Sequence, residues 1–519
     1  MRIRHLFAGL TLFIALGGIP AESSAQKINT VQRPDVSTVL PIMQMLASAG
    51  LEGRETGTRG GYLAANYVAS MMEYAGLKPY GSKQAGGHST LSDYFHPFKL
   101  LRYAPHVSPI EITGRKNSKD KLFPGKDFTV EDAMSDLFFN SQLVFAGYGI
   151  SDSGLKYNDY AHLDVKNKIV LVIEGYPGKH DTLSPAWLKF RKTAIDDAFD
   201  TGKKCREAER LGAKALVLIP ESCLKKDELR QPENLTDGPY QDAEYFLPSA
   251  KIQSSIPLIQ LTESGAQKIE KSSGLHFADL DHQIACEKVG FPLQIEQSIK
   301  ARIYVTIDTL LVYNVIGCLR GSDTTKSIIL GAHYDHLGIR DSCIYYGSDD
   351  NASGVAGLLA IAGMLSKSIT VPPCNLVFAS WTAEEKGLIG SEFFTSQLTN
   401  NEGIKLYINM DMISRSVSED TACNMLSVGT RTCDSSLREI AADLNSSLGK
   451  PFILDLWDVT GHSGSDYASF TAKNIPILTF NTGLHNDYHT PRDTTSRADF
   501  DKMLSVIQLV CSILNETRK

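Results

Sequence analysis

The chain contains 519 residues, too many for one ordinary domain, so two or more packed units are expected. Apolar residues make up 42% and charged residues 21% of the sequence, proportions typical of globular proteins that exclude an intrinsically disordered chain. The formal net charge of -7, with both signs mixed along the sequence, argues against nucleic acid as the main partner.

The first residues have the pattern of a secretory signal peptide. Two arginines precede an apolar run at 6–16, and small residues at 23–25 offer a cleavage site. A transmembrane anchor is the alternative, but the run is shorter than the roughly 20 residues that span a bilayer. We therefore expect residues 1–25 to be removed from an exported protein, periplasmic or extracellular, that is not stably inserted in a membrane.

Residues 36–77 are predicted to form two helices around a polar, glycine-rich loop at 52–60. The second helix is expected to stop at Gly76. A phosphate-binding loop is the alternative, but no apolar strand leads into the loop and no Gly-Lys-Ser sequence follows it. A loop that closes one side of a pocket fits the sequence better.

The segment 116–294 differs from its surroundings in its short β-rich runs, and it contains no recognisable catalytic set. Its histidines are isolated from one another. We interpret it as an inserted β-rich domain between two parts of a catalytic domain, 26–115 and 295–519. Strands are predicted at 142–147, 168–174 and 215–219, and a helix at 193–211.

Strands and helices alternate in the last third of the chain, after an alternating pattern at 301–308 that indicates a long strand or hairpin. Apolar strands separated by helices imply an α/β fold, a mostly parallel sheet with helices on both faces. Right-handed crossovers would place the strand ends along one edge. The predicted strands are 328–332, 375–381, 405–410, 425–428 and 475–480; the predicted helices are 352–366, one from 387, 435–444 and 499–514.

Nine cysteines are scattered along the sequence without any Cys-x-x-Cys pair. An exported chain permits disulfides, and the odd number leaves at least one thiol unpaired within the monomer. Cys423 with Cys433, or Cys205 with Cys223, are the bridges that the spacing allows, and we assign no cysteine to a metal.

Side chains that bind metals follow the predicted strands where each strand ends. His333 ends the first buried strand, and imidazole nitrogen binds zinc well at neutral pH. Asp335 is placed to hold the other ring nitrogen. Asp350 lies in an Asp-Asp-Asn-Ala-Ser-Gly sequence that opens a helix, where a carboxylate can bridge two cations. A helix N-cap cluster is the alternative for that sequence.

Two adjacent acids, Glu384 and Glu385, leave the next strand, and their burial is costly unless metal ions compensate their charge. One can bind a metal while the other faces the substrate as an acid or base. Asp411 ends the third strand among apolar neighbours. We predict His489 as a ligand and His485, four residues earlier, as a pocket wall or a satisfied polar group.

These motifs resemble the di-zinc exopeptidase family of bacterial leucyl aminopeptidases, which includes glutamate carboxypeptidase and glutaminyl cyclase. The resemblance covers the whole mature chain, with a Glu-Gly-Arg-Glu-Thr-Gly loop and a protease-associated domain insert. The C-terminal motifs that carry it are His-x-Asp, Asp-Asp-Asn-Ala-Ser-Gly, Glu-Glu, Met-Asp-Met and His-x-Pro-x-Asp-Thr.

The resemblance implies the zinc exopeptidase fold, two Zn²⁺ ions per chain and a role for each motif. Glu384 would be the general base and Asp335 the partner of His333. A cis peptide bond would follow the bridging residue, between Asp350 and Asn351. The implied ligands are His333 and Asp411 for one ion, Glu385 and His489 for the other, and Asp350 as the bridge.

One position departs from the well-studied secreted members, which carry a tyrosine near the reaction centre where this chain places His462. An imidazole there can polarise a carbonyl or stabilise an oxyanion. A serine nucleophile at Ser463 is the rival interpretation, but the sequence lacks the second glycine of Gly-x-Ser-x-Gly at the right offset.

The expected function is that of an exported metallo-aminopeptidase acting on peptides with a free N-terminus, through a hydroxide between two zinc ions. A carboxypeptidase or dipeptidase on the same metal centre is the alternative. A glutaminyl cyclase fits less well, because such enzymes alter motifs that are intact here. A non-catalytic binding protein is the alternative from another class, and relatives of that kind lose ligands.

Overall fold

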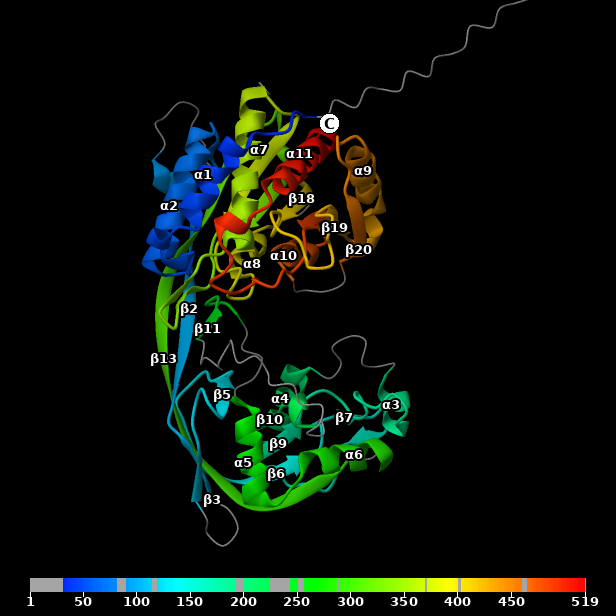
Figure 1. Ribbon diagram of the computed structural model, residues 1–519. Helices are drawn as coiled ribbons and strands as arrows, with labels where there is room; N and C mark the ends of the chain where they lie inside the picture. Colours follow the sequence, from blue (N-terminus) through cyan, green and yellow to red (C-terminus); the bar gives the residue numbers. More distant parts are fainter. Residues whose placement is uncertain are drawn as a thin grey trace, which may run out of the picture.

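Two bodies joined by a long two-stranded ribbon make up the protein (Figure 1). The α/β body has a core formed by residues within 39–94 and 315–514, and the insert body has a core within 110–303. The ribbon consists of β2 (Phe95–Val107) and β13 (Pro292–Leu319). The computed structural model describes residues 31–81, 90–113, 119–191, 200–224, 243–250, 256–287, 290–368, 371–399, 403–459 and 464–518.

The sheet of the α/β body has the strand order β1-β13-β17-β14-β18-β21-β19-β20. Four central strands, β17, β14, β18 and β21, run parallel, and β13 and β19 pair with them in the antiparallel direction. The sheet is therefore mixed and mostly parallel. The strands are β1 (Lys78–Pro79), β14 (Asp323–His333), β17 (Cys374–Trp381), β18 (Ile404–Met410), β19 (Met425–Thr430), β20 (Ile453–Asp458) and β21 (Ile477–Asn481).

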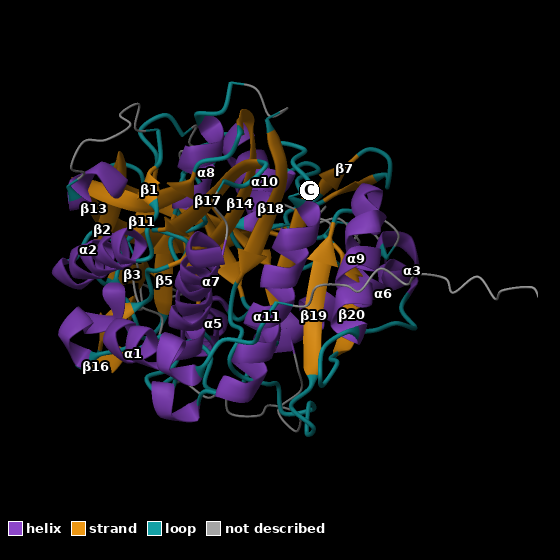
Figure 2. Ribbon diagram, turned by 90° about the horizontal axis from the view of Figure 1, so that it is seen from above, coloured by secondary structure: helices purple, strands orange, loops and turns teal. Residues whose placement is uncertain are grey.

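Both faces of this sheet are covered by helices because its central strands are apolar on both sides (Figure 2). In β14, Ile328 and Leu330 enter one core while Ile329 enters the other. Helices α1, α2, α7, α9 and α11 contribute to the first core, and α8 and α10 to the second. These are α1 (Val36–Leu46), α2 (Arg59–Tyr74), α7 (Gly354–Ser368), α8 (Ile389–Ser396), α9 (Ser435–Ser446), α10 (Tyr467–Thr471) and α11 (Phe500–Thr517).

One strand connects the two bodies. β13 pairs with β17 at its carboxyl end, with β2 over 303–315, and with β6 (Leu137–Ala146) at its amino end. The alternating pattern at 301–308 is therefore part of a single 28-residue strand and not of a hairpin.

The insert body is built on a second run of strands in the order β13-β6-β9-β10-β12-β5, with β3 and β4 beside them. The three strands predicted in this segment correspond to β6, β9 and β10. Its assignment as a protease-associated domain, and the boundaries 116 and 294, stay predictions. The elements are β3 (Ile110–Thr113), β4 (Lys119–Leu122), β5 (Phe128–Glu131), β9 (Ile169–Ile173), β10 (Ala215–Ile219), β11 (Glu244–Phe246), β12 (Leu258–Leu261), α3 (Pro185–Phe190), α4 (Thr201–Arg210), α5 (Glu263–Ser273) and α6 (Phe277–Glu287).

Some expectations from the sequence differ from the structure or lie outside it. β20 was not predicted, because this edge strand is half-exposed and carries no continuous apolar run. Cys423 and Cys433 are exposed free thiols and Cys205 is a buried one, so neither of the two considered disulfides is formed. The predicted signal peptide, 1–25, lies outside the described residues. In the part of the chain that is described, no helix is long and apolar enough to cross a membrane.

A buried ion pair fastens α11 to the segment between β18 and β19. The Nζ of Lys502 lies 2.8 Å from Oδ2 of Asp420, and the two side chains are 0% and 2% exposed. Lys502→Met should lower the free energy of unfolding by about 3–5 kcal/mol, because it leaves a buried carboxylate without its cation. Urea denaturation measures the change.

Lys326→Met is the matched control, because Lys326 forms an exposed pair with Asp323. Its loss should stay within about 1 kcal/mol. Equal losses in the two variants would contradict a special contribution from the buried pair.

Candidate metal centre

The predicted metal-binding side chains meet at one edge of the sheet. Because β14, β17, β18 and β21 run parallel, their carboxyl ends lie together, which is where open α/β sheets place their sites. His333 is the last residue of β14, Glu384 and Glu385 follow β17, Asp411 follows β18, and His489 lies in the loop after β21.

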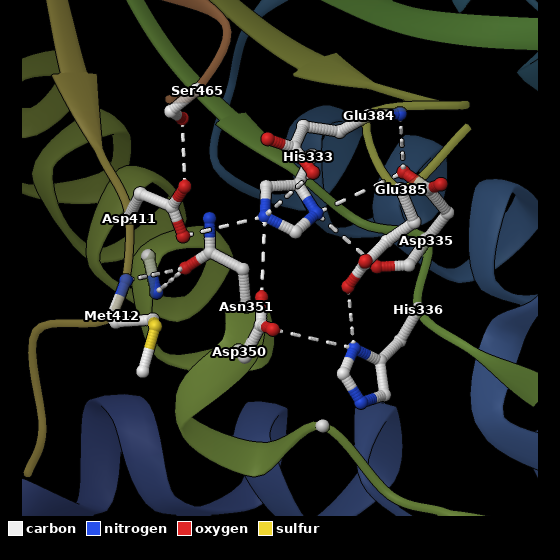
Figure 3. A network of polar contacts seen from close by, with 12 residues as sticks. His333, Asp335, His336, Asp350, Asn351, Glu384, Glu385, Asp411, Met412 and Ser465 are labelled. Atoms are coloured by element: carbon white, nitrogen blue, oxygen red, sulfur yellow. Dashed lines mark hydrogen bonds and ion pairs between the residues drawn. The ribbon is translucent and has the colours of Figure 1, made fainter. Parts of the chain in front are cut away.

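A first group of ligand atoms surrounds the Nε2 atom of His333, as Figure 3 shows. Asp411 Oδ1 lies 3.3 Å from this nitrogen, Asp350 Oδ1 lies 3.4 Å from it, and Glu384 Oε2 lies 3.9 Å from it. His333, Glu384 and Asp411 each offer a ligand atom, and these three atoms lie within 4.8 Å of one another. Such a cluster of one imidazole and several carboxylates can hold a divalent ion.

A second group forms around His489. Its Nε2 atom lies 3.2 Å from Asp350 Oδ2 and 3.3 Å from Glu385 Oε2. Asp350 thus turns one carboxylate oxygen toward His333 and the other toward His489. A carboxylate in that position can bridge two metal ions.

The loop that carries Asp350 is held by its neighbours on both sides. Its peptide bond to Asn351 is cis, which confirms the position that the family resemblance implies. Asn351 accepts a hydrogen bond from the N–H of Gly354, the first residue of α7, and donates to the Met410 carbonyl of β18. Asp493 accepts the N–H of Asp350. Asn351 therefore caps the helix start, which leaves Asp350 to face the histidines.

A chain of hydrogen bonds fixes the orientation of Asp411. The indole N–H of Trp381 can only donate and the carboxylate of Asp411 accepts, so the direction of every bond between them is determined. Ser465 consequently donates to Oδ2 and leaves Oδ1 facing His333. The bonds run from Trp381 Nε1 to Tyr407 Oη (3.0 Å), from there to Asn409 Oδ1 (2.7 Å), from Asn409 Nδ2 to Ser465 Oγ (3.0 Å), and on to Asp411 Oδ2 (2.7 Å).

His336 is a member of the site that the sequence interpretation missed. Its Nδ1 atom lies 2.8 Å from Glu385 Oε1 and 3.6 Å from Asp350 Oδ2, and its side chain is fully buried. The ring packs against Gly347, where a Cβ atom would come within 2.5 Å of it and where φ is +55°. Its place three residues after His333, at the same strand end, was the signal that could have identified it.

Asp335 supports two parts of the site. The Nδ1 atom of His333 lies 3.2 Å from the main-chain carbonyl of Asp335 and 3.8 Å from its carboxylate. That carboxylate accepts hydrogen bonds from Thr56 Oγ1 and from the N–H of Glu384. The carbonyl, more than the carboxylate, is thus placed to hold the ring of His333, while the carboxylate holds the segment that carries Glu384.

His485 is buried beside the loop that carries Asp350. Its Nδ1 accepts the N–H of Asp487, and its Nε2 lies 3.4 Å from Asp349 Oδ2. It therefore behaves as a packed polar group and not as a pocket wall. His462 and Ser463 lie outside the described residues.

The pKa shifts of these groups reflect the close packing of buried acids and histidines. Burial raises the pKa of Glu384 well above its ordinary value. Burial opposes the charge on His489, but its bonds to Asp350 and Glu385 raise its pKa to about 10. Burial likewise opposes the charge on Glu385, yet the contacts with His336 and His489 lower its pKa to about 2. The oxygen and nitrogen ligands, with this demand for positive charge, fit a divalent ion such as zinc.

Metal removal should therefore destabilise the protein, because the buried carboxylates would lose cations that compensate their charge. Restoring zinc to about 100 times its dissociation constant should raise the free energy of unfolding by about 2.7 kcal/mol for each independent site. Thermal unfolding of chelator-treated protein with and without zinc measures this. Asp350→Asn should weaken the response, and an unchanged melting temperature in the native sequence would exclude a metal centre here.

Parts of the chain are similar to known peptidases. Residues 314–514 match the model of Peptidase family M28. A Glutamate carboxypeptidase 2 homolog of Caenorhabditis elegans is 27% identical over 62% of this chain and 45% of its own length. A probable leucine aminopeptidase 2 of Trichophyton verrucosum is 32% identical over 33% of this chain and 34% of its own length. The chain spans about half the length of the first two curated relatives, 45% and 56%.

Two solved structures share the fold along almost the whole chain. An aminopeptidase from Aneurinibacillus sp. strain AM-1 has a TM-score of 0.58 at 20% identity and covers 93% of this chain and 94% of its own. A zinc aminopeptidase from Bacillus subtilis has a TM-score of 0.55 at 18% identity and covers 94% and 96%. The chain therefore shares the fold of these aminopeptidases, and its residues 314–514 are similar to peptidase family M28.

Proposed function

We propose that the protein is an exported zinc aminopeptidase that binds two Zn²⁺ ions per chain and removes N-terminal residues from peptides. The observation that carries the proposal is the position of Asp350 between His333 and His489, with Glu384 beside the first group. Relatives named as leucine aminopeptidases support the choice of reaction. Export rests on the signal-peptide pattern of residues 1–25.

The residues of each group would hold one ion. Zinc, when bound, polarises a scissile carbonyl and lowers the pKa of water to about 7 in favourable sites. His336 lies close enough to Glu385 to orient its carboxylate or to add a nitrogen ligand. The ligands would be His333 and Asp411 for one ion, Glu385 and His489 for the other, and Asp350 for both.

Glu384 would move the proton in the reaction. Its buried carboxyl has a raised pKa, and its main-chain N–H is held by Asp335, so the group is both positioned and able to exchange a proton. It would take a proton from the attacking water and return it to the leaving amine. The acids around the centre would attract the free α-amine of a peptide, which favours cleavage at its N-terminus.

The insert body would allow short peptides to reach the metal centre and exclude longer ones. It contributes Tyr245, on β11, whose ring lies 5.1 Å from the Nζ of Lys386, the residue directly after Glu385. This contact supports a position of part of the insert beside the metal centre. Access by long or folded chains would therefore be restricted.

A carboxypeptidase or dipeptidase is the second candidate, because the first two curated relatives are named Glutamate carboxypeptidase 2 homologs. A panel of aminoacyl reporter substrates, with and without chelator, tests the first candidate. Free peptides compared with N-acetylated and C-amidated ones separate the two. Cleavage that survives N-acetylation but is lost on C-amidation would replace the aminopeptidase by the carboxypeptidase.

Glu384→Gln should lower turnover by about 10²- to 10⁴-fold, because an amide cannot accept the proton. Bound zinc should stay unchanged, since Glu384 lies furthest from His333 among the three acids of its group. Steady-state kinetics and elemental analysis of the same preparation measure the two quantities. Turnover close to that of the native sequence would remove Glu384 from this role.

A further inference from the structure

We propose that three consecutive residues near the N-terminus, Arg54, Glu55 and Thr56, are positioning residues of the metal centre. We call them the 54–56 clamp. Together their side chains bind the three segments that carry ligands or the general base, and the Thr56 hydroxyl fixes the segment of Glu384. Their effect on metal binding follows from geometry alone, whereas their effect on turnover rests on the proposed function.

The hydroxyl of Thr56 joins two of these segments. Its Oγ1 atom donates to Asp335 Oδ2 at 2.9 Å and accepts the N–H of Ala383 at 3.0 Å. The other oxygen of Asp335 accepts the N–H of Glu384. Thr56 is buried, with 3% of its surface exposed. Its hydroxyl links Asp335 to the N–H of Ala383, and Asp335 in turn accepts the N–H of Glu384. No ligand is involved directly, so its effect would be on position.

Arg54 binds the segment of His333 and the segment before Asp350 through main-chain carbonyls. Its guanidinium donates to Tyr334 O (2.8 Å) next to His333, and to Tyr346 O (2.7 Å) and Gly347 O (2.8 Å) before the bridging Asp350. The side chain is fully buried. Burial lowers its pKa to about 10, so the group stays charged at neutral pH. A permanent cation thus lies behind the carboxylates and ties two ligand segments together.

Glu55 binds the residue after the paired acids. Its Oε1 lies 2.8 Å from the Nζ of Lys386, whose side chain is only 8% exposed. Lys386 follows Glu385 directly, so this ion pair fixes the segment after the paired acids, whereas Thr56 fixes it before them. The two bonds together leave little freedom for Glu384 and Glu385.

The backbone before the clamp explains why three neighbours can point to different segments. Glu52, Gly53 and Arg54 all have positive φ, of 53°, 69° and 53°. A Cβ atom on Gly53 would lie 2.4 Å from the Gly338 carbonyl and 2.6 Å from that of Tyr345, so only glycine fits there. The loop is therefore shaped by close contact with the segments it holds.

Thr56→Val and Thr56→Ser form the main test. Valine keeps the shape of threonine without its hydroxyl, and serine keeps the hydroxyl. Thr56→Val should weaken zinc binding, measured by competition with a chelator, and lower kcat, each by about 10- to 100-fold. KM should change by no more than about twofold, because no substrate contact is removed. Thr56→Ser should restore both quantities to near the native values.

Thr430→Val is the matched control, because Thr430 on β19 is fully buried and its hydroxyl has no hydrogen-bond partner among the described residues. It should leave zinc affinity, kcat and KM unchanged. If Thr56→Val does not fold, Glu55→Gln tests the same clamp at a partly exposed side chain, and it should weaken zinc binding at least about threefold.

Native zinc affinity in Thr56→Val, or failure of Thr56→Ser to restore it, would overturn the proposal. So would an equal loss in Thr430→Val, which would reveal a general effect of substitution in the core. Failure of the proposed function is distinguishable, because the native protein would then cleave no peptide in the panel while the zinc measurements still report on the clamp.

Discussion

The structure depends on one electrostatic constraint, the crowding of buried carboxylates at the edge of the sheet. Asp350, Glu384, Glu385 and Asp411 all approach His333 or His489 within 3.9 Å. Such a group of acids is costly in a buried site unless cations compensate its charge. Histidines and a guanidinium lie around it, and bound metal would compensate the remaining negative charge. The parallel strands, the capped helix start and the N-terminal loop all serve to hold this arrangement.

Much of the fold and of the site could be predicted because its local signals were strong. β14, β17, β18 and β21 are buried apolar runs, so their spacing indicated the sheet, and the histidine and acids that follow them indicated where candidate ligands meet. The exposed edge strand β20 lacks such a run and was missed. His336 was missed although its segment carries a strong signal, because His333 and Asp335 already accounted for the metal-binding pattern there.

The remaining features depend on contacts between distant parts of the sequence, which a single sequence does not specify. Thr56 and Asp335 are 279 residues apart, and Arg54 and Tyr334 are 280 apart. The loop of these N-terminal residues was expected only to close a pocket, whereas it reaches beneath the metal centre. Likewise, His485 could be a wall or a packed group until its burial beside Asp349 was known.

The continuous strand β13 has a consequence for how the molecule could lose its insert. Its amino-terminal half pairs with β6 and β3, and its carboxyl-terminal half with β2 and β17. Deletion of the insert alone would remove the hydrogen-bonding partners of residues 292–303. The resulting unpaired strand edge would favour aggregation. A stable form without the insert would have to shorten β2 and β13 by the same length. The two bodies are therefore joined through a shared strand and not through a flexible linker.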